Sequence, residues 1–348
     1  MRTLEWDKAE NRLKMIDQRV LPSQLQYIHL NTYQSVADAI QNMTVRGAPA
    51  IGVAAAYGVV LAAMQLEDLS LNDFYAELKK TFQHLEQSRP TAVNLPWALK
   101  RMWSVAEKDF HNTKQIVEAF LNEAHKMADE DVETNLAISK FGAELIDNGD
   151  TIIHHCNTGS LATVDWGTAL GVIRMAHEQG KQLHVLVDET RPRLQGARLT
   201  AWELSQYHIP YDIINDSAAG FFLQKGLAQK VIFGADHVAR NGDVANKIGS
   251  YMLALAAHDN HVPVYSVFPT STVDLDIENG SQIKIEERDQ SEVLDIKLQD
   301  EWVSPTGASA RNPAFDVTPH NLITAWITEK GIIYPPFYEN LNKHSSGK

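Results

Sequence analysis

The sequence predicts an α/β protein, with a parallel-sheet domain preceded by a smaller, mainly helical domain. The chain has 348 residues, 44% of them hydrophobic, which is enough for two domains with sizeable cores. Its pattern changes near residue 148: apolar residues first recur with helical spacing, and later short apolar runs alternate with turns and helix-like stretches. We therefore expect a mainly helical N-terminal domain over residues 1–147 and a second domain over residues 148–348.

The first 147 residues contain one candidate strand and several candidate helices. Residues 25–30 are apolar enough for a strand, and residues 35–42 have helical periodicity. Ser70 can cap a further helix, in which apolar residues recur at spacings of three or four. These apolar residues are Phe74, Leu78, Phe82 and Leu85. Two more helical patterns cover residues 92–108 and 113–146.

The uncharged run "APAIGVAAAYGVVLAAM" at residues 48–64 is the one segment that needs a membrane test. It is shorter than the roughly 20 residues that span a bilayer, is rich in alanine and glycine, and has a proline as its second residue. We expect a buried helix of a soluble protein here, with no membrane partner. The charged N-terminal segment has no apolar signal core either.

Net charge and cysteine content restrict the expected partners and cellular compartment. The formal net charge is −13, which argues against a nucleic-acid partner because such a partner requires a basic surface. The single cysteine, Cys156, cannot form an internal disulfide, so a reducing compartment is expected. Together with the missing signal sequence, this predicts a cytoplasmic protein.

The second domain shows a repeated order of strand, turn and helix. Its short apolar runs are "TIIHH", "LHVLVD", "YDII", "KVIFGAD" and "VPVYSV", and the first four precede polar turns and helix-like stretches. This alternation is typical of a parallel sheet with helices on both faces. No G-x-G-x-x-G lies between a strand and a helix, so a dinucleotide cofactor is not supported.

Ligands of an open parallel sheet bind beyond the carboxyl ends of its strands. The segments that follow the predicted strands are unusually polar, and Cys156 and Asp236 lie in the first and last of them. Either residue also has an ordinary structural explanation, since lone cysteines are usually buried hydrophobes and aspartate is common in turns. Position alone leaves both interpretations open for Cys156, which precedes a polar turn and a helix predicted to begin near Asp165.

Three basic residues lie beside predicted helix starts, where backbone amides can bind an anion. Lys247 lies in "NKIG", predicted to open a helix, Arg46 precedes the helix of residues 49–64, and Arg89 lies in "SRPTAVNL". A single surface arginine is usually just solvated, but three such turns together indicate a phosphate site. The histidines, by contrast, have no metal-ligand spacing or accompanying carboxylate cluster, so no metal is expected.

Several long motifs resemble one enzyme family over nearly the whole chain. They are "TVRGAPAIG", "SRPTAVNL", "HCNTGSLATVDWGTALG", "DETRPRLQGARLTAWEL", "ARNGDVANKIG" and "NPAFDVTP". In these motifs the chain is similar to the methylthioribose-1-phosphate isomerases of methionine salvage, which are related to ribose-1,5-bisphosphate isomerases and to regulatory subunits of initiation factor 2B. The resemblance implies a Rossmann-like parallel-sheet domain behind a mainly helical N-terminal domain, in a homodimer.

The resemblance also implies the roles of individual residues. Cys156 and Asp236 are expected as the catalytic pair. The expected substrate contacts are Arg46, Gly47, Ala48, Arg89, Gln195, Asn246 and Lys247. Two positions depart from the family's pattern: His154, where threonine is usual, and His237, where arginine is usual.

The expected reaction explains these residue types. A sugar phosphorylated at its anomeric carbon cannot open its ring by aldehyde exchange, so an acid must protonate the ring oxygen. The apolar approach "VIFGAD" suits Asp236 to that role because burial favours a neutral carboxylic acid. Hydrogen then moves between C2 and C1, with Cys156 removing a proton or stabilising a hydride shift. Neither route needs a redox cofactor or a metal.

Three alternatives differ in what they require. A regulatory subunit would not need the Cys156/Asp236 pair, whereas a bisphosphate isomerase would need basic groups at the far end of the sugar. A methylthio group instead calls for apolar surface, for which Trp97 and Met102 are candidates. A cysteine hydrolase would need a histidine base, and His155, adjacent in a strand, is expected to face the opposite side.

Overall fold

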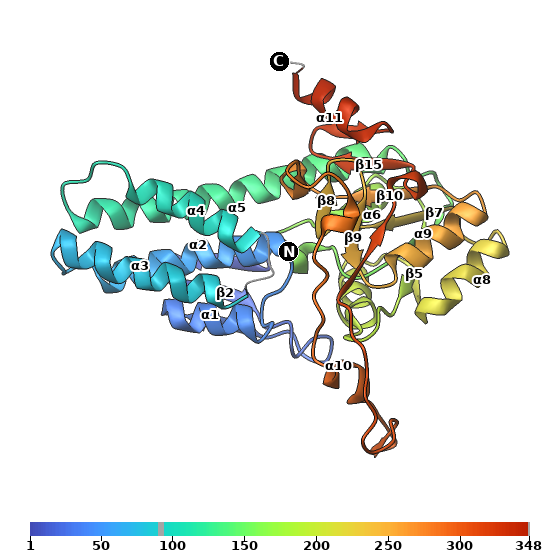
Figure 1. Cartoon of the computed structure of the whole chain (residues 1–348), viewed down its shortest axis with the longest axis horizontal. Coiled ribbons are helices and arrows are strands. Elements are labelled where there is room, and N and C mark those ends of the chain that lie inside the picture. Colours follow the sequence, from blue (N-terminus) through green and yellow to red (C-terminus); the bar gives the residue numbers. More distant parts are fainter. Residues whose placement is uncertain (90–93, 347–348) are drawn as a thin grey trace. The chain divides into compact units, whose positions relative to one another are not determined.

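The computed structural model describes residues 1–89 and 94–346 (Figure 1). The chain divides into two compact units. Unit 1 comprises Met1–Asn135 with Gly159–Gly167, and unit 2 comprises Leu136–Thr158 with Thr168–Lys348. The predicted boundary followed the change of pattern near residue 148, whereas the compact units divide within one long helix, α5 (Thr113–Ala143), whose hydrophobic periodicity runs through the division.

Unit 1 begins with an antiparallel sheet in the order β1-β2-β3 (Leu4–Asp7, Arg12–Ile16 and Tyr27–Leu30). Only β3 was predicted. The first two strands alternate buried apolar and more exposed polar side chains, as in Leu4, Glu5, Trp6 and Asp7. That period of two is the signal of a half-buried strand, and the high charge of the segment obscured it.

The α-helices in the described part of unit 1 are α1 (Tyr33–Gln41), α2 (Ala48–Gln65), α3 (Leu71–Gln87), α4 (Asn94–Ala106) and the start of α5 (Thr113–Ala143). The side chain of Ser70 caps α3 as predicted, accepting a hydrogen bond from the Asp73 amide. Figure 1 shows α2, α3, α4 and α5 lying alongside one another. The predicted helical character of this part of the chain is confirmed.

Helix α2 lies at the centre of the unit 1 core, and nearly every one of its side chains is buried. Among the described residues it is the one helix long and apolar enough to cross a membrane. However, 78% of its 18-residue apolar window is buried within the protein. Its uniform hydrophobicity follows from this position, since a helix surrounded by neighbours has no polar face.

Unit 2 is built on a seven-stranded sheet in the order β16-β15-β10-β7-β4-β5-β6. The strands are β4 (Thr151–His154), β5 (His184–Asp188), β6 (Tyr211–Ile214), β7 (Lys230–Phe233), β10 (Val264–Val267), β15 (Ala325–Thr328) and β16 (Gly331–Ile333). All pairings are parallel except that between β15 and β16. The five predicted strands are therefore present in a parallel sheet.

The helices of unit 2 follow these strands. They are α6 (Ala169–Glu178), α7 (Ala201–Gln206), α8 (Ala219–Gln224), α9 (Ser250–Asp259), α10 (Ser291–Leu294) and α11 (Phe337–Ser346). The helix predicted near Asp165 begins later: residues 160–162 form a short 3-10 turn, η1, and α6 starts at Ala169. Gly159–Gly167, which contains η1, belongs to unit 1.

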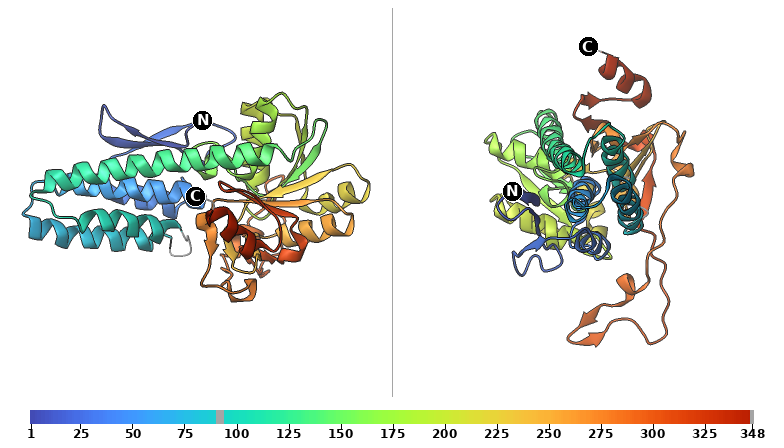
Figure 2. Two further views of the ribbon diagram at one scale, coloured as in Figure 1. Left: turned by 90° about the horizontal axis from the view of Figure 1, so that it is seen from above. Right: turned by 90° about the vertical axis from the view of Figure 1, so that its left-hand side faces the viewer.

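A second, four-stranded sheet of unit 2 was not predicted. Its order is β11-β8-β9-β14, from Val273–Asp274, His237–Ala239, Val244–Lys247 and Phe315–Thr318. The chain between β11 and β14 carries a small hairpin, β12 (Lys297–Leu298) with β13 (Glu301–Trp302), on an arm that extends away from the sheets in the right-hand view of Figure 2. The polar segment after β7 thus continues as strands before α9 begins.

Candidate active site

The carboxyl ends of β7, β4, β5 and β6 lie side by side in the sheet of unit 2. Strands β4 and β7 are parallel neighbours, with His154 opposite Ile232 at their ends. Cys156 comes two residues after β4, and Asp236 comes three residues after β7. The sheet therefore brings the two predicted catalytic residues to the same edge, just after the carboxyl ends of two adjacent strands.

Cys156 is fixed by its backbone as well as by its surroundings. Its side chain is 6% exposed, and its φ of +70° lies in the left-handed region that few residues adopt. The Cys156 amide donates to Thr190 Oγ1 at 2.9 Å, and Thr200 Oγ1 donates to the Cys156 carbonyl at 2.7 Å. An uncommon backbone conformation, held on both sides by hydroxyl groups, is typical of functional sites.

Gln195 contacts the thiol directly, because its Nε2 lies 3.4 Å from Cys156 Sγ. It precedes a π-helical turn, η2 (Gly196–Thr200), a feature that is frequent at functional sites. A Cβ atom on Gly196 would lie 1.8 Å from the Asp188 carbonyl oxygen, so only glycine permits this close approach. The structure thus brings Gln195, a predicted substrate contact, to Cys156.

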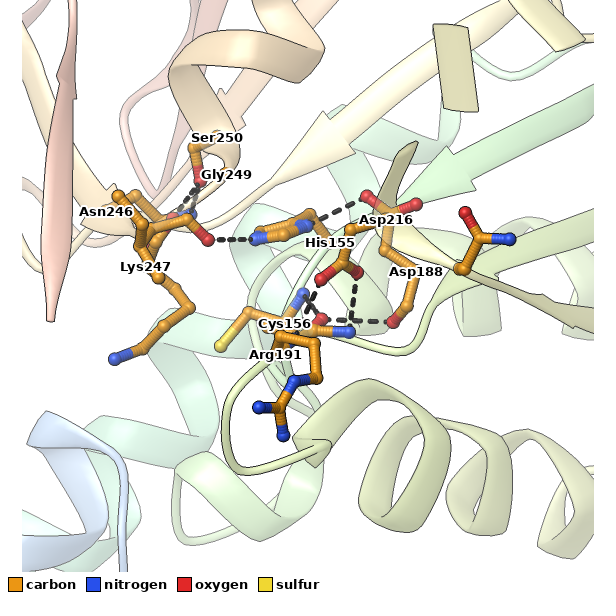
Figure 3. A network of polar contacts seen from close by, with 12 residues as sticks. His155, Cys156, Asp188, Arg191, Asp216, Asn246, Lys247, Gly249 and Ser250 are labelled. Carbon is orange, nitrogen blue, oxygen red and sulfur yellow. Dashed lines mark hydrogen bonds and ion pairs between the residues drawn. The ribbon is translucent and has the colours of Figure 1, made fainter. Parts of the chain in front are cut away.

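His155 lies in a buried charge cluster that the sequence did not reveal. Its Nδ1 is 2.8 Å from Asp188 Oδ2 and its Nε2 is 2.9 Å from the Ile248 carbonyl oxygen. Figure 3 shows the imidazole between the carboxylates and the segment that carries Asn246 and Lys247. Burial lowers the pKa of His155, but the bond to Asp188 and nearby negative charges outweigh it and raise that pKa to about 9.

The prediction that no carboxylate cluster accompanies the histidines was wrong, since three of the four histidines that might suggest a metal have carboxylate partners. The four are His154, His155, His184 and His237. Besides His155, His184 Nε2 lies 2.9 Å from Asp212 and His237 Nε2 lies 3.1 Å from Asp274. His154 is instead fully buried with Nε2 2.8 Å from Thr158 Oγ1, and burial lowers its pKa to about 3. These partners lie 28 to 37 residues away in the chain, beyond the reach of motif spacing.

One group of described side chains has atoms close enough together to hold a metal: His155, Asp188 and Asp216, within 4.8 Å of one another. Most of these atoms already have other partners: Asp216 accepts the amides of Thr190 and Arg191 at 2.7 and 2.8 Å, and His155 Nδ1 bonds to Asp188 Oδ2. Asp188 Oδ1 is buried without a hydrogen-bond partner. A metal at His155 Nδ1 would have to displace its bond to Asp188, so the geometry describes a hydrogen-bonded cluster that shapes the loop after β5.

Asn246 and Lys247 lie at the end of β9, and the Asp236 amide donates to the Ala245 carbonyl of the same strand at 2.9 Å. Lys247 Nζ donates to the Ala314 carbonyl at 2.7 Å and lies over the Phe315 ring at 4.7 Å. Strand β9 therefore joins three of the predicted site residues: Asp236, Asn246 and Lys247.

The predicted anion site at the start of α9 needs correction. Residues 246 and 247 are in a strand, and α9 begins only at Ser250. The carboxylate of Asp316, from strand β14, accepts the amides of Gly249 and Tyr251 at 2.7 and 3.1 Å. These amides are therefore bound by the protein's own carboxylate and do not face an external anion.

The other predicted substrate contacts belong to unit 1. Gly47 is the N-cap of α2 with φ 88° and ψ 132°, and Arg46 and Ala48 flank it at the helix start, as predicted. Residue Arg89 is partly buried after α3, whereas residues 90–93 of its motif lie outside the described residues. A Cβ on Gly47 would lie 2.2 Å from the Ala162 carbonyl oxygen, so glycine is required here.

The two apolar candidates in unit 1 differ in accessibility. Met102 is fully buried in the helical core, whereas Trp97 is 49% exposed. Met102 therefore has no surface to offer a ligand, and Trp97 remains as a candidate.

Comparisons with known proteins agree with the motifs. The model of the initiation factor 2 subunit family matches residues 44–335. The methylthioribose-1-phosphate isomerase of Acetivibrio thermocellus is 52% identical over 348 residues, covering 99% of this chain and 100% of that protein. The enzyme of the same name from Thermotoga maritima is 52% identical over 344 residues, covering 98% and 97%.

Two solved structures have the same fold. The crystal structure of 5-methylthioribose 1-phosphate isomerase from Pyrococcus horikoshii superimposes with a TM-score of 0.93 at 43% identity, covering 100% of this chain and 96% of that one. A structure described as translation initiation factor eIF-2B, subunit delta, from A. fulgidus has a TM-score of 0.89 at 43% identity, covering 99% of each chain. The chain belongs to the initiation factor 2 subunit family, and within that family it belongs to the methylthioribose-1-phosphate isomerases.

Proposed function

We propose that this chain is an isomerase that converts 5-methylthioribose 1-phosphate to 5-methylthioribulose 1-phosphate in methionine salvage. The proposal depends most on one observation: Cys156 and Asp236 follow the carboxyl ends of β4 and β7, which are adjacent parallel strands. A thiol and a carboxylic acid at one sheet edge supply the two proton-transfer groups that the reaction needs. The full-length relatives of the same name support the choice of substrate.

Asp236 acts first, as the general acid. It gives its proton to the ring oxygen while the bond between that oxygen and C1 breaks, leaving a C1 cation stabilised by the remaining oxygen. Asp236 comes three residues after β7, a strand whose four residues are all buried, and is itself only partly buried, so its carboxyl group can reach a ligand at the sheet edge.

Cys156 serves the hydrogen transfer that follows. In one route its thiolate removes the proton from C2, a double bond forms between C1 and C2, and C1 is then reprotonated as the C2 hydroxyl loses its proton. In the other route, hydrogen moves from C2 to C1 with its electron pair while the thiolate stabilises the neighbouring positive charge, and the C2 hydroxyl then gives its proton to the Asp236 carboxylate to leave the ketone. Both routes conserve atoms and electrons, and the phosphate stays on C1.

The phosphate and hydroxyl groups need fixed polar partners. In unit 2 these are Gln195, beside the thiol, and Asn246 with Lys247 on β9. Arg46, Gly47, Ala48 and Arg89 of unit 1 are proposed as further contacts. Charged and bidentate donors are the usual ligands of a phosphate.

A regulatory role is the second candidate, because the A. fulgidus structure with 43% identity is described as a subunit of a translation initiation factor. Such a subunit needs neither Cys156 nor Asp236. A direct comparison of substrates separates the possibilities. The protein is incubated in parallel with 5-methylthioribose 1-phosphate and ribose 1,5-bisphosphate, and the products are identified by NMR. Conversion of the first compound alone is expected, and failure to convert either one would favour the regulatory role.

We further propose that the protein is a cytoplasmic homodimer. The single cysteine suits a reducing compartment. The oligomeric state follows from the family resemblance and is tested by light scattering behind size-exclusion chromatography. A mass of about twice the 38.9 kDa of one chain is expected, and a mass of 38.9 kDa would contradict the proposal.

A further inference from the structure

Both ring nitrogens of His155 face hydrogen-bond acceptors. Nδ1 lies 2.8 Å from the Asp188 carboxylate, and Nε2 lies 2.9 Å from the Ile248 carbonyl oxygen. A carbonyl oxygen has no hydrogen to give, so Nε2 must carry one. A neutral imidazole has only that one hydrogen, and Nδ1 would then face an ionised carboxylate with its lone pair. With both hydrogens present, the ring is a cation that donates two bonds.

The charges around the ring favour the cation. Asp188 from β5 is 1% exposed and His155 is equally buried, so each would be costly as an unpaired charge. Asp216, after β6, and Asp316, from β14, add further negative charge near the ring. Cys156, the next residue in the chain, interacts favourably with the same positive charge. His154, the preceding residue, opposes a second positive charge here, and burial together with that repulsion keeps His154 neutral.

His155 also joins two parts of the candidate active site. On one side it is bonded in sequence to Cys156. On the other it binds the carbonyl of Ile248, the residue after Lys247. Gly249 packs so closely on the ring that a Cβ at this glycine would lie 2.8 Å from His155 Cε1. The ring therefore fixes the turn between β9 and α9 relative to the end of β4 (Figure 3).

We propose that His155 is a positioning residue held as an imidazolium, which fastens the Asn246–Lys247 segment to the Cys156 turn and places a fixed positive charge beside the thiol. It touches neither substrate nor reacting atoms and acts through its neighbours. This proposal deepens the proposed function, because the segment it fastens is the one expected to bind the phosphate. It also corrects the expectation that His155 is directed away from the site: β4 ends at His154, so strand alternation no longer applies at His155.

Two substitutions separate the two hydrogen bonds that the His155 ring makes. The side-chain amide of His155→Asn can replace Nδ1–H and keep the bond to Asp188, but it cannot reach Ile248. The amide of His155→Gln can replace Nε2–H and keep the bond to Ile248, but it gives up the bond to Asp188. Neither variant carries a charge. His184→Gln is the matched control, because His184 also pairs with an aspartate but is 37% exposed at the start of β5.

The kinetic expectations differ between the variants. The value of kcat should fall in both variants, because neither carries the charge. His155→Asn should in addition raise KM, since the Asn246–Lys247 segment loses its attachment, and a small misplacement of this kind can cost about 10²-fold. His155→Gln keeps that attachment, so its KM should stay close to that of the wild type. In both variants iodoacetamide should alkylate Cys156 about tenfold more slowly, because the thiolate is the reacting form. His184→Gln should match the wild type in all three readouts, and the same result in both His155 variants would overturn the proposal.

Nitrogen NMR of the ring tests the charge without any substituted protein. In wild-type protein labelled at the histidine nitrogens, one imidazole should remain protonated at both nitrogens at pH 8, where an ordinary histidine with a pKa near 6.5 is neutral. That signal should disappear in either His155 variant. A neutral His155 ring at pH 8 would overturn the proposal even if the variants fold poorly. Failure of the wild type to convert methylthioribose 1-phosphate would instead count against the proposed function, because the NMR and alkylation results do not depend on turnover.

Discussion

Replacing Gly47 by alanine tests whether a predicted substrate contact is shaped by backbone packing within unit 1. The new Cβ would lie 2.2 Å from the Ala162 carbonyl oxygen and 2.4 Å from Ala162 Cα, more than an ångström short of an ordinary contact. Both atoms belong to the backbone, so no side chain can rotate away. Overpacking of this kind costs about 1–3 kcal/mol. The backbone at φ 88° and ψ 132° adds about 1–3 kcal/mol of strain for any residue with a Cβ.

Gly180→Ala is the matched control, because Gly180 has the same φ of +88° but nothing within 4 Å of its added Cβ. Backbone strain alone should cost it about 1–2 kcal/mol. We expect Gly47→Ala to lower the free energy of unfolding by about 4 kcal/mol, measured by urea titration followed by helical circular dichroism. Turnover should fall as well, since the segment from Gly159 to Gly167 has to move. Equal destabilisation by the two substitutions would refute the packing argument.

Three further predictions concern the site and its histidines. Asp236→Asn should keep the fold and lower kcat by about 10²–10⁴-fold, because an amide cannot give the proton; a variant with more than half of wild-type turnover would exclude Asp236 as the acid. Lys247→Ala and Arg46→Ala should each weaken substrate binding by about 1.5–3 kcal/mol, because each removes a charge-assisted hydrogen bond to the phosphate. The affinity is measured by calorimetry in the inactive Asp236→Asn protein, and an unchanged affinity would place the phosphate elsewhere. Burial lowers the pKa of His154 in the folded protein to about 3, whereas in the unfolded chain this histidine binds a proton near pH 6.5. The free energy of unfolding should therefore fall as the pH drops from about 6.5 towards 3, by at most about 1.4 kcal/mol per pH unit. In His154→Thr that slope should decrease between pH 6 and 4, and an unchanged slope would exclude His154 as its source.

The parallel sheet was predictable because its strands are short apolar runs bounded by turns. Strands β4, β5, β6, β7 and β10 all follow this pattern, and chain order alone placed Cys156 and Asp236 at carboxyl ends. The four-stranded sheet was missed because β8 ("HVA") and β9 ("VANK") are not continuous apolar runs and are separated by the polar turn "RNGD". Short strands in polar surroundings owe their formation to their partners, which periodicity does not reveal.

The groups that hold the site in place depend on contacts between distant parts of the chain. Asp188 is 33 residues from His155, Ile248 is 93 residues from it, and Asp316 is 67 residues from Gly249. The motifs "DET" and "NPAFD" drew attention to the segments, but only the sheet order brings Asp188 beside β4, and only the pairing of β14 with β9 brings Asp316 to α9. The predicted helix start at residues 246–249 was wrong for the same reason.

Turnover of methylthioribose 1-phosphate by Cys156→Ser is the most direct test of the central claim, that this thiol and not merely its volume is needed. Serine keeps the size of the side chain, and a hydroxyl ionises far less readily than a thiol. We expect the Cys156→Ser protein to be close to inactive, with the circular dichroism and unfolding behaviour of the wild type. In the wild type, iodoacetamide should abolish activity and substrate should slow that loss, with no ambiguity of assignment because the chain has no other cysteine. Full activity in a stably folded Cys156→Ser protein would exclude a catalytic role for the thiol.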